Sequence, residues 1–122
     1  MADEQFLEFF ELEEFSSDWD DLGLDVEHDL WDLQTLIMNA PANAPVVKGT
    51  NGLRKLRFAP RGWKVGKSGA VRVCYVFFQR FGIVLLVMAY RKNEKDNLTA
   101  TQSRAIASYI RRAEKWLERR MQ

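Results

Sequence analysis

The chain has 122 residues, of which 47% are hydrophobic and 29% are charged, a composition typical of a folded domain and not of a disordered segment. Its single cysteine, Cys74, excludes an internal disulfide, and its longest apolar run, residues 83–89, is much shorter than the roughly 20 residues of a membrane-spanning helix. The acidic first residues lack the basic start of a signal peptide. We therefore expect one domain over residues 1–122, located in the cytoplasm.

The net charge of +1 conceals a strong separation of charge along the chain. Residues 1–47 contain 13 Asp and Glu and no Lys or Arg, which gives −13, whereas residues 48–122 contain 18 Lys and Arg against four acidic residues, which gives +14. A basic segment of this strength suits a polyanion such as RNA. The acidic segment would offset this charge or set the orientation of the chain on a partner.

The chain begins with an ambiguous apolar segment, residues 6–15, which read FLEFFELEEF. Its apolar positions fit a strand and a helix about equally well, and we favour a strand over residues 7–12. Ser16 and Ser17 then offer an N-cap for a short helix through Asp21, which Gly23 would end.

Residues 25–39 show a clearer helical periodicity, and Pro41 and Pro45 would end this helix. Its predicted apolar stripe comprises Val26, Leu30, Leu33 and Ile37, widened by Trp31 and Met38.

Three strand-like segments follow, at residues 53–58, 70–78 and 83–90. The short turn at residues 79–82 predicts that the last two form an antiparallel hairpin. The third segment is almost wholly apolar, which predicts a central strand covered on much of both faces.

The last predicted element is a helix over residues 100–120, with Thr99 as its N-cap and Gln102 completing a capping box. Its predicted apolar face comprises Ile106, Tyr109, Ile110, Ala113, Trp116 and Leu117. The order of elements predicts an α+β fold in which helices cover one face of an antiparallel sheet and leave the other face free for a ligand.

Three local motifs favour ordinary structural interpretations. Residues 62–68 read GWKVGKS, but Arg61 stands where a phosphate-binding loop needs glycine, and a strand follows instead of a helix. His28 lies among aspartates, a pattern more typical of a solvated histidine than of a metal ligand. Cys74 lies within an apolar strand and is most simply a core residue. We therefore expect no metal site and no cofactor.

The basic residues of the predicted sheet indicate a surface that binds a ligand. Lys55 and Arg57 share one strand face, because they are two residues apart. Arg72 interrupts an apolar strand, and burying an unpaired arginine is costly, so it should face solvent or an anion. Their grouping on an open sheet face favours contact with RNA phosphates over a merely solvated surface. More polar and basic residues follow the last strand, at Tyr90, Arg91, Lys92 and Lys95.

Three segments in order resemble one known family. Residues 49–57 read GTNGLRKLR, residues 71–75 read VRVCY, and residues 85–98 read LLVMAYRKNEKDNL. They are similar to the GTGGLRKLR, xRxxYY and LLxxYxKNExxDL segments of HigB-type toxins in the RelE superfamily, and the match extends over roughly residues 48–118. The acidic first third matches only in the order of its elements.

The resemblance implies a microbial-RNase-like α+β fold, ribosome-dependent cleavage of messenger RNA and neutralisation by a cognate antitoxin protein, with no membrane and no small-molecule cofactor involved. Arg57 and Arg72 would stabilise the phosphorane, because guanidinium groups grip phosphate and stay charged. Lys55 or Lys92 would serve as a base, and Tyr90 would stack on a nucleobase or donate a proton. The catalytic set is then Lys55, Arg57, Arg72, Tyr90, Lys92 and Lys95, and the further RNA-binding set is Arg54, Lys64, Lys67 and Arg91.

Two alternatives stay open at this stage. A non-catalytic RNA-binding module would keep RNA affinity and show no cleavage. A toxin of the related ParE type would inhibit gyrase. The basic sheet residues favour RNA over gyrase, while the general acid and base remain unassigned by the sequence.

Overall fold

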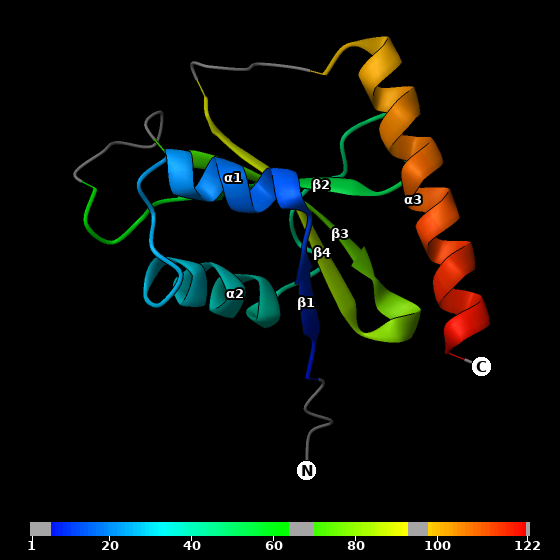
Figure 1. Cartoon of the computed structure of the whole chain (residues 1–122), viewed down its shortest axis with the longest axis horizontal. Coiled ribbons are helices and arrows are strands. Elements are labelled where there is room, and N and C mark those ends of the chain that lie inside the picture. The colour runs from blue at the N-terminus through cyan, green and yellow to red at the C-terminus, as the bar shows by residue number, and fades with distance from the viewer. Residues whose placement is uncertain (1–5, 64–69, 93–97, 122) are drawn as a thin grey trace.

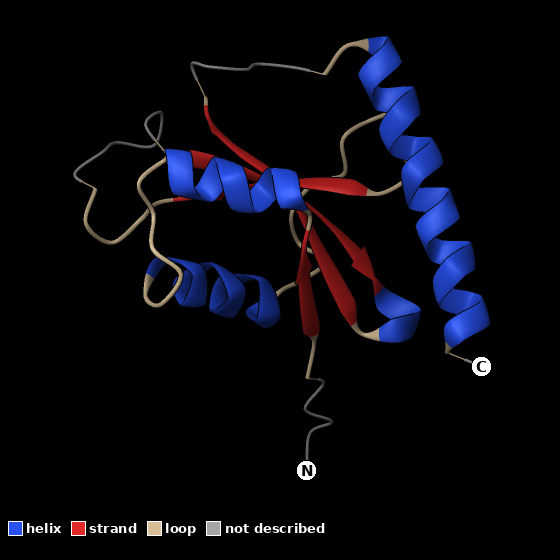
Figure 2. Cartoon of the chain, in the orientation of Figure 1, coloured by secondary structure: helices blue, strands red, loops and turns tan. Residues whose placement is uncertain are grey.

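A computed structural model describes residues 6–63, 70–92 and 98–121 (Figures 1 and 2). The fold is α+β, as predicted, and none of the helices in these ranges is both long and apolar enough to cross a membrane. The elements in chain order are β1 (Glu8–Glu11), α1 (Glu13–Asp21), α2 (Asp29–Asn39), β2 (Leu53–Phe58), β3 (Val71–Phe78), a short 3-10 turn (Gln79–Phe81), β4 (Ile83–Arg91) and α3 (Ala100–Arg120).

The four strands form one mixed sheet in the order β1-β4-β3-β2. β3 pairs antiparallel with both β2 and β4, which confirms the predicted hairpin, whereas β1 pairs parallel with β4. The hairpin turn closes at Gly82, whose positive φ of 64° suits a residue without Cβ. The central position of β4 agrees with its nearly continuous apolar sequence.

Helices α1 and α2 cover one face of the sheet (Figure 2). Phe15 of α1 is completely buried, and its ring stacks on Trp19 with centroids 5.3 Å apart. Leu33 and Ile37 of α2 join the same cluster, together with residues of β2, β3 and β4. This cluster is the larger of the two cores.

Helix α3 lies over the other face of the sheet, so our prediction that the helices cover one face and leave the other free for a ligand is wrong for α3. Alternate residues of β3, including Cys74 and Val76, are apolar on this side and would be exposed to water unless another element packed on them. Ile110 and Leu117 of α3 provide that cover, which yields a second core cluster. Cys74 is buried there, as predicted for a core residue. The sheet is therefore covered on both sides, with α3 alone on one of them (Figure 1).

The pairing of β3 with β4 contains a β-bulge, which changes the side-chain alternation of β4. Tyr75 pairs with Leu86, but the preceding Cys74 pairs with Met88, so Val87 is an extra residue. Val87 and Met88 both face the α3 side as a result. Just beyond the bulge, the Ala89 N–H donates to the Asp18 carboxylate of α1 at 3.0 Å.

Two helices begin at other residues than predicted. α1 begins at Glu13, three residues before Ser16, and the Ser16 hydroxyl donates to the Glu11 carboxylate at 2.8 Å instead of capping a helix. α2 begins at Asp29 and not at residue 25. The Asp25 carboxylate accepts hydrogen bonds from the N–H groups of His28 (2.7 Å) and Asp29 (2.8 Å), so residues 25–28 form a capping turn before the helix.

The predicted apolar stripe of α2 is also too wide. Val26 belongs to the capping turn and is exposed, and Trp31 and Met38 are exposed as well. Only Leu30, Leu33 and Ile37 are buried on this helix. By contrast, α3 spans the predicted residues, and the Thr99–Gln102 capping box is present at its start.

Replacing Asp25 with Ala should lower the melting temperature by a few degrees, because two N–H groups at the start of α2 lose their acceptor. These bonds, first from Asp29 and then from His28, lower the pKa of Asp25 below its ordinary value of 3.8. Because the folded-state pKa is the depressed one, the stabilisation is present above the ordinary value and is lost as the pH falls through the folded value. Thermal unfolding of wild type, Asp25→Ala and the exposed control Asp20→Ala across this range tests this. An effect of Asp25→Ala that stays constant down to the lowest pH would contradict it.

Candidate functional site

Three strands bring predicted site residues into one row. Arg57 of β2 lies directly opposite Arg72 of β3, and Arg72 lies directly opposite Tyr90 of β4. Opposite residues share a sheet face, with Cβ atoms roughly 4.5–5.5 Å apart. Lys55 lies on the same face, two residues before Arg57. We call Lys55, Arg57, Arg72 and Tyr90 the basic row.

The basic row lies on the α3 side of the sheet, at the end that α3 leaves uncovered. Leu53 and Cys74 of this face belong to the core beneath α3. Cys74 lies opposite Lys55, and the pair Arg57–Arg72 lies two residues further along the strands, away from that core. Arg57 is exposed, while Lys55, Arg72 and Tyr90 are half-buried. The predicted free face therefore exists, but only over part of the sheet.

The bulge in β4 places Tyr90 in this row. Strict alternation from Ile83 would point Arg91 to the α3 side and Tyr90 to the α1–α2 side. The extra residue Val87 reverses this order, so Tyr90 packs at the edge of the α3 cluster. The aromatic ring thus lies beside the guanidinium-bearing strands.

The row concentrates positive charge. Arg57 and Arg72 are like charges directly opposite each other, an arrangement that destabilises a sheet. Within the described ranges, the acidic residues form ion pairs with His28, Arg61 and Arg80, and none with either of these arginines. The Arg72 guanidinium donates to the Ala70 carbonyl at 3.5 Å, a long contact. A phosphate between the two arginines would convert their repulsion into bidentate binding.

The remaining predicted residues do not all join the row. Arg54 lies on the opposite face, where its guanidinium donates to the carbonyls of Ala42 (2.9 Å) and Ala44 (2.7 Å). Arg91 also faces that side, with its guanidinium 4.2 Å from the ring centroid of Trp63. Lys92 is exposed just after β4. The predicted residues Lys64, Lys67 and Lys95 lie outside the described ranges.

Arg54→Ala should reduce the stability of the chain. Its charged hydrogen bonds tie the segment before β2 to the strand, and their loss should cost about 1–2 kcal/mol. Chemical denaturation measures this cost, and Arg57→Ala, three positions further along the same strand and on its other face, is the control for charge. Equal stability of Arg54→Ala and wild type would show that these bonds contribute nothing.

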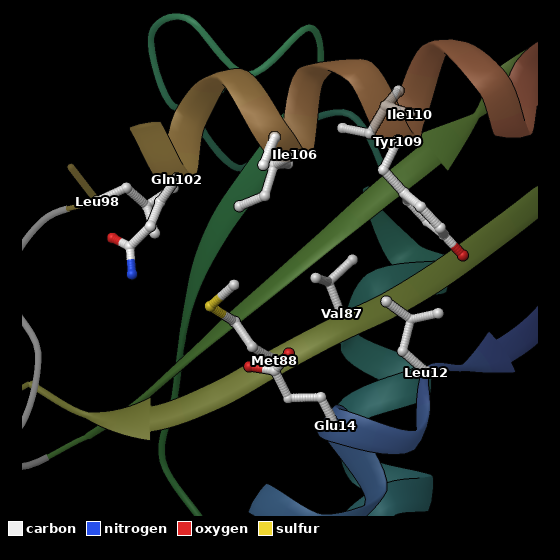
Figure 3. A pocket seen from close by; sticks show the side chains of 10 residues that line it. Leu12, Glu14, Val87, Met88, Leu98, Gln102, Ile106, Tyr109 and Ile110 are labelled. Carbon is white, nitrogen blue, oxygen red and sulfur yellow. The ribbon is translucent and has the colours of Figure 1, made fainter. Parts of the chain in front are cut away.

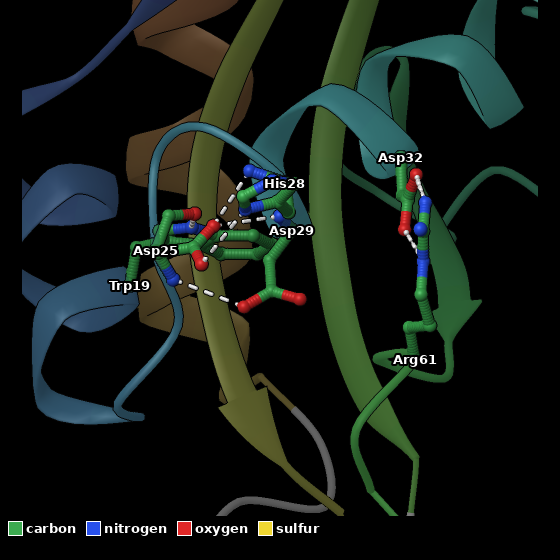
Figure 4. A network of polar contacts seen from close by, with 6 residues as sticks. All are labelled: Trp19, Asp25, His28, Asp29, Asp32 and Arg61. Carbon is green, nitrogen blue, oxygen red and sulfur yellow. Dashed lines mark hydrogen bonds and ion pairs between the residues drawn. The ribbon is translucent and has the colours of Figure 1, made fainter.

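Another polar cluster lies at the start of α2 (Figure 4). The His28 Nδ1 lies 3.6 Å from the Asp25 carboxylate, and both side chains are exposed, which agrees with a solvated histidine. Arg61 forms a two-point contact with Asp32, at 3.0 and 2.6 Å, that no sequence spacing indicated. The described residues contain no group of three side chains arranged to hold a metal ion. Most of the phosphate-loop-like segment 62–68 lies outside the described ranges.

Comparisons with known proteins support the fold. No family model matches the sequence. Among solved structures, the chain is similar to a mutant of the E. coli toxin RelE in the free state, with a TM-score of 0.54 and 15% sequence identity, over 75% of this chain and 88% of that chain. The chain therefore has a RelE-like fold, as the sequence resemblance implied.

Proposed function

We propose that this RelE-like chain is the toxin of a type II toxin–antitoxin system, which cuts messenger RNA on the ribosome and is neutralised by a cognate antitoxin. The basic row is the observation that carries the proposal. Two arginines and a tyrosine lie side by side on three adjacent strands, and a lysine lies next to them. This arrangement offers phosphate binding and base stacking on one open surface.

The row suits RNA cleavage by the substrate's own 2′-hydroxyl. That oxygen attacks the adjacent phosphorus, the bond to the 5′-oxygen breaks, and a 2′,3′-cyclic phosphate and a free 5′-hydroxyl result. Arg57 and Arg72 would stabilise the charge that develops on the phosphorane, since guanidinium groups bind phosphate oxygens in pairs. Lys55 and Lys92 are the candidates for taking the proton from the 2′-hydroxyl. Tyr90 would stack on a neighbouring base or protonate the leaving oxygen.

The openness of the row is consistent with a need for the ribosome. Arg57 is exposed, and the other members of the row are half-buried on a sheet face. Such a surface supplies charge but little restraint on the geometry of a flexible single strand. Precise alignment of the reacting atoms is worth several orders of magnitude in rate. A ribosome that holds the messenger in a fixed conformation would supply this alignment.

The decisive experiment incubates the purified chain with messenger RNA, either free or on programmed ribosomes, and maps the 5′ ends. We expect cleavage on ribosomes and little or none of free RNA. Ribosome binding without cleavage would instead favour the non-catalytic module. Inhibition of gyrase supercoiling without any effect on translation would favour the ParE-type alternative.

The charge separation of the chain predicts its orientation on the ribosome. Removing charge from the basic row and its surroundings, as in Arg57→Gln with Lys92→Gln, should weaken binding and flatten its dependence on salt. Removing Asp20 and Asp21, which are exposed on α1, should leave binding equal or tighter, because carboxylates near RNA repel phosphates within a Debye length of about 8 Å. Asp18 and Asp25 are left intact, since both bind backbone N–H groups.

Ribosome affinity measured at several salt concentrations checks this orientation. One double variant removes two positive charges and the other removes two negative charges, so each controls for the other. If Asp20→Asn with Asp21→Asn loses affinity as steeply as the basic variant, the acidic segment is part of the contact and the orientation is wrong.

A further inference from the structure

Helix α3 has two very different faces. Its inner face is apolar, and Ile106 and Ile110 point toward the sheet, where Val87 and Met88 of β4 lie (Figure 3). Its outer face is basic and exposed over a length of about 22 Å, because residues at helical spacing bring their side chains to one side. These residues, which we call the α3 stripe, are Arg104, Arg111, Arg112, Lys115 and Arg119.

The α3 stripe is unfavourable for the helix on its own. Lys115 lies four residues from both Arg111 and Arg119, and like charges at this spacing repel. The helix dipole favours cations only in the last turn, so it does not account for Arg104, Arg111 or Arg112. Within the described ranges, no side chain of the stripe forms an ion pair. An acidic surface from outside the molecule would relieve this repulsion.

Helix α1 presents a surface of the opposite charge. Its exposed face carries four carboxylates over about 12 Å, opposite the buried Phe15 and Trp19. The helix dipole favours carboxylates in the first turn but not Asp20 and Asp21 near the C-terminal end, where α1 has no basic residue. Within the described ranges these four also form no ion pair. The four residues are Glu13, Glu14, Asp20 and Asp21.

The two charged surfaces of one molecule lie on opposite sides of the sheet. α1 packs in the core cluster on one face, and α3 packs in the cluster on the other face (Figure 1). Their outer faces therefore point away from each other. A second copy can place its α1 carboxylates on the α3 stripe of the first, and its own stripe then remains available to a third copy. Such head-to-tail contacts produce open chains or rings.

The charge of the whole chain favours a second copy over a nucleic acid as the occupant of the α3 stripe. A nucleic acid would neutralise the stripe but would leave the carboxylates of α1 without a partner. A second copy neutralises both surfaces with one kind of contact. The net charge is only +1, so little overall repulsion opposes the approach of two molecules.

We infer that the chain self-associates head to tail at low ionic strength, with the acidic face of α1 of one copy docked on the α3 stripe of the next. A single exposed ion pair contributes little, so the contact depends on several pairs acting together and on weak screening by salt. The inference does not depend on RNA cleavage, because neither surface shares a residue with the basic row.

The test is sedimentation velocity of the purified full chain at rising concentrations. For wild type we expect the average mass to increase with concentration at about 0.01 M salt and not to stop at a dimer. At about 0.1 M salt the Debye length has fallen from about 30 Å to about 10 Å, so self-association should be at least about tenfold weaker. A chain that stays monomeric at the lower salt concentration, or that stops at a dimer, would contradict the inference.

Neutral substitutions assign the two surfaces. The α1 variant combines Glu13→Gln, Asp20→Asn and Asp21→Asn, and the stripe variant combines Arg111→Gln, Arg112→Gln and Lys115→Gln. All six side chains are exposed, so both variants should keep the wild-type fold, which circular dichroism checks. Each variant should self-associate at least about tenfold more weakly than wild type. A control variant removes as much negative charge from other elements and should lose much less association than the α1 variant. It combines Glu8→Gln, Glu11→Gln and Glu27→Gln.

Mixing the two variants distinguishes head-to-tail contact from other modes of association. The α1 variant keeps an intact stripe and the stripe variant keeps an intact acidic face, so the mixture should form a one-to-one dimer that grows no further. Absence of this dimer would overturn the inference. An equal loss of association in the control variant would also overturn it, because net charge would then be the cause. Binding of double-stranded RNA by a monomeric wild type, lost in the stripe variant, would assign the stripe to a nucleic acid instead.

Discussion

Arg72→Ala should lower the rate of messenger cleavage on ribosomes about 100-fold or more, the usual scale for removing one donor that stabilises a transition-state charge. The same variant should be as stable as wild type or slightly more stable. Arg72 lies directly opposite Arg57, and removing one of two opposed like charges relieves a repulsion of roughly 0.2–1 kcal/mol. A large loss of activity without loss of stability is the signature of a residue kept for its ligand.

Single-turnover cleavage and chemical denaturation of the same preparations measure both effects. Arg111→Ala removes the same charge from the exposed surface of α3 and is the matched control. Arg57→Ala should behave like Arg72→Ala, because the two residues lie opposite each other and both guanidinium groups would bind the same phosphate in the proposed reaction. Wild-type cleavage by a folded Arg72→Ala variant would exclude Arg72 from the site.

Phe15→Ala should destabilise the chain by about 3–5 kcal/mol, enough to unfold a large share of the molecules of a small domain. Phe15 is completely buried beneath α1, and its ring stacks on Trp19. Its removal leaves a cavity in the larger core cluster, where the surrounding side chains come from three strands and both N-terminal helices. The rigid sheet limits how far this cavity can collapse.

Urea denaturation of Phe15→Ala and of Phe6→Ala provides the comparison. Phe6 is 83% exposed, so its removal should change stability by no more than about 0.5 kcal/mol. Similar losses of stability in the two variants would mean that burial of Phe15 beneath α1 does not dominate the stability of the first third of the chain.

Elements with strong local signals were predictable from the sequence. β2 and α3 have the predicted bounds, since alternation in one and a capping box in the other act within a few residues. The start of α2 was not predictable at the same level. The apolar pattern suggested that the helix begins at Asp25. In the structure, the Asp25 carboxylate instead caps the turn that leads into the helix.

The candidate site shows where local patterns fail. Two-residue spacing was enough to place Lys55 and Arg57 on one face, and the register adds Arg72 opposite Arg57. The sequence could not decide between Tyr90 and Arg91, because their faces depend on a bulge that only the pairing with β3 reveals. It also could not separate Arg54 from the RNA-binding set, since its acceptors are carbonyls 10 and 12 residues away along the chain.

The bulge also makes β4 unusually tolerant of a change in its length. In a regular strand, losing one residue turns every side chain beyond it to the opposite face. Here the residues on either side of Val87 pair with two neighbouring residues of β3, because Leu86 pairs with Tyr75 and Met88 pairs with Cys74. A chain without Val87 would therefore keep Tyr90 beside Arg72. The basic row needs the bulge only because the strand contains Val87, and a regular strand one residue shorter would place Tyr90 on the same face.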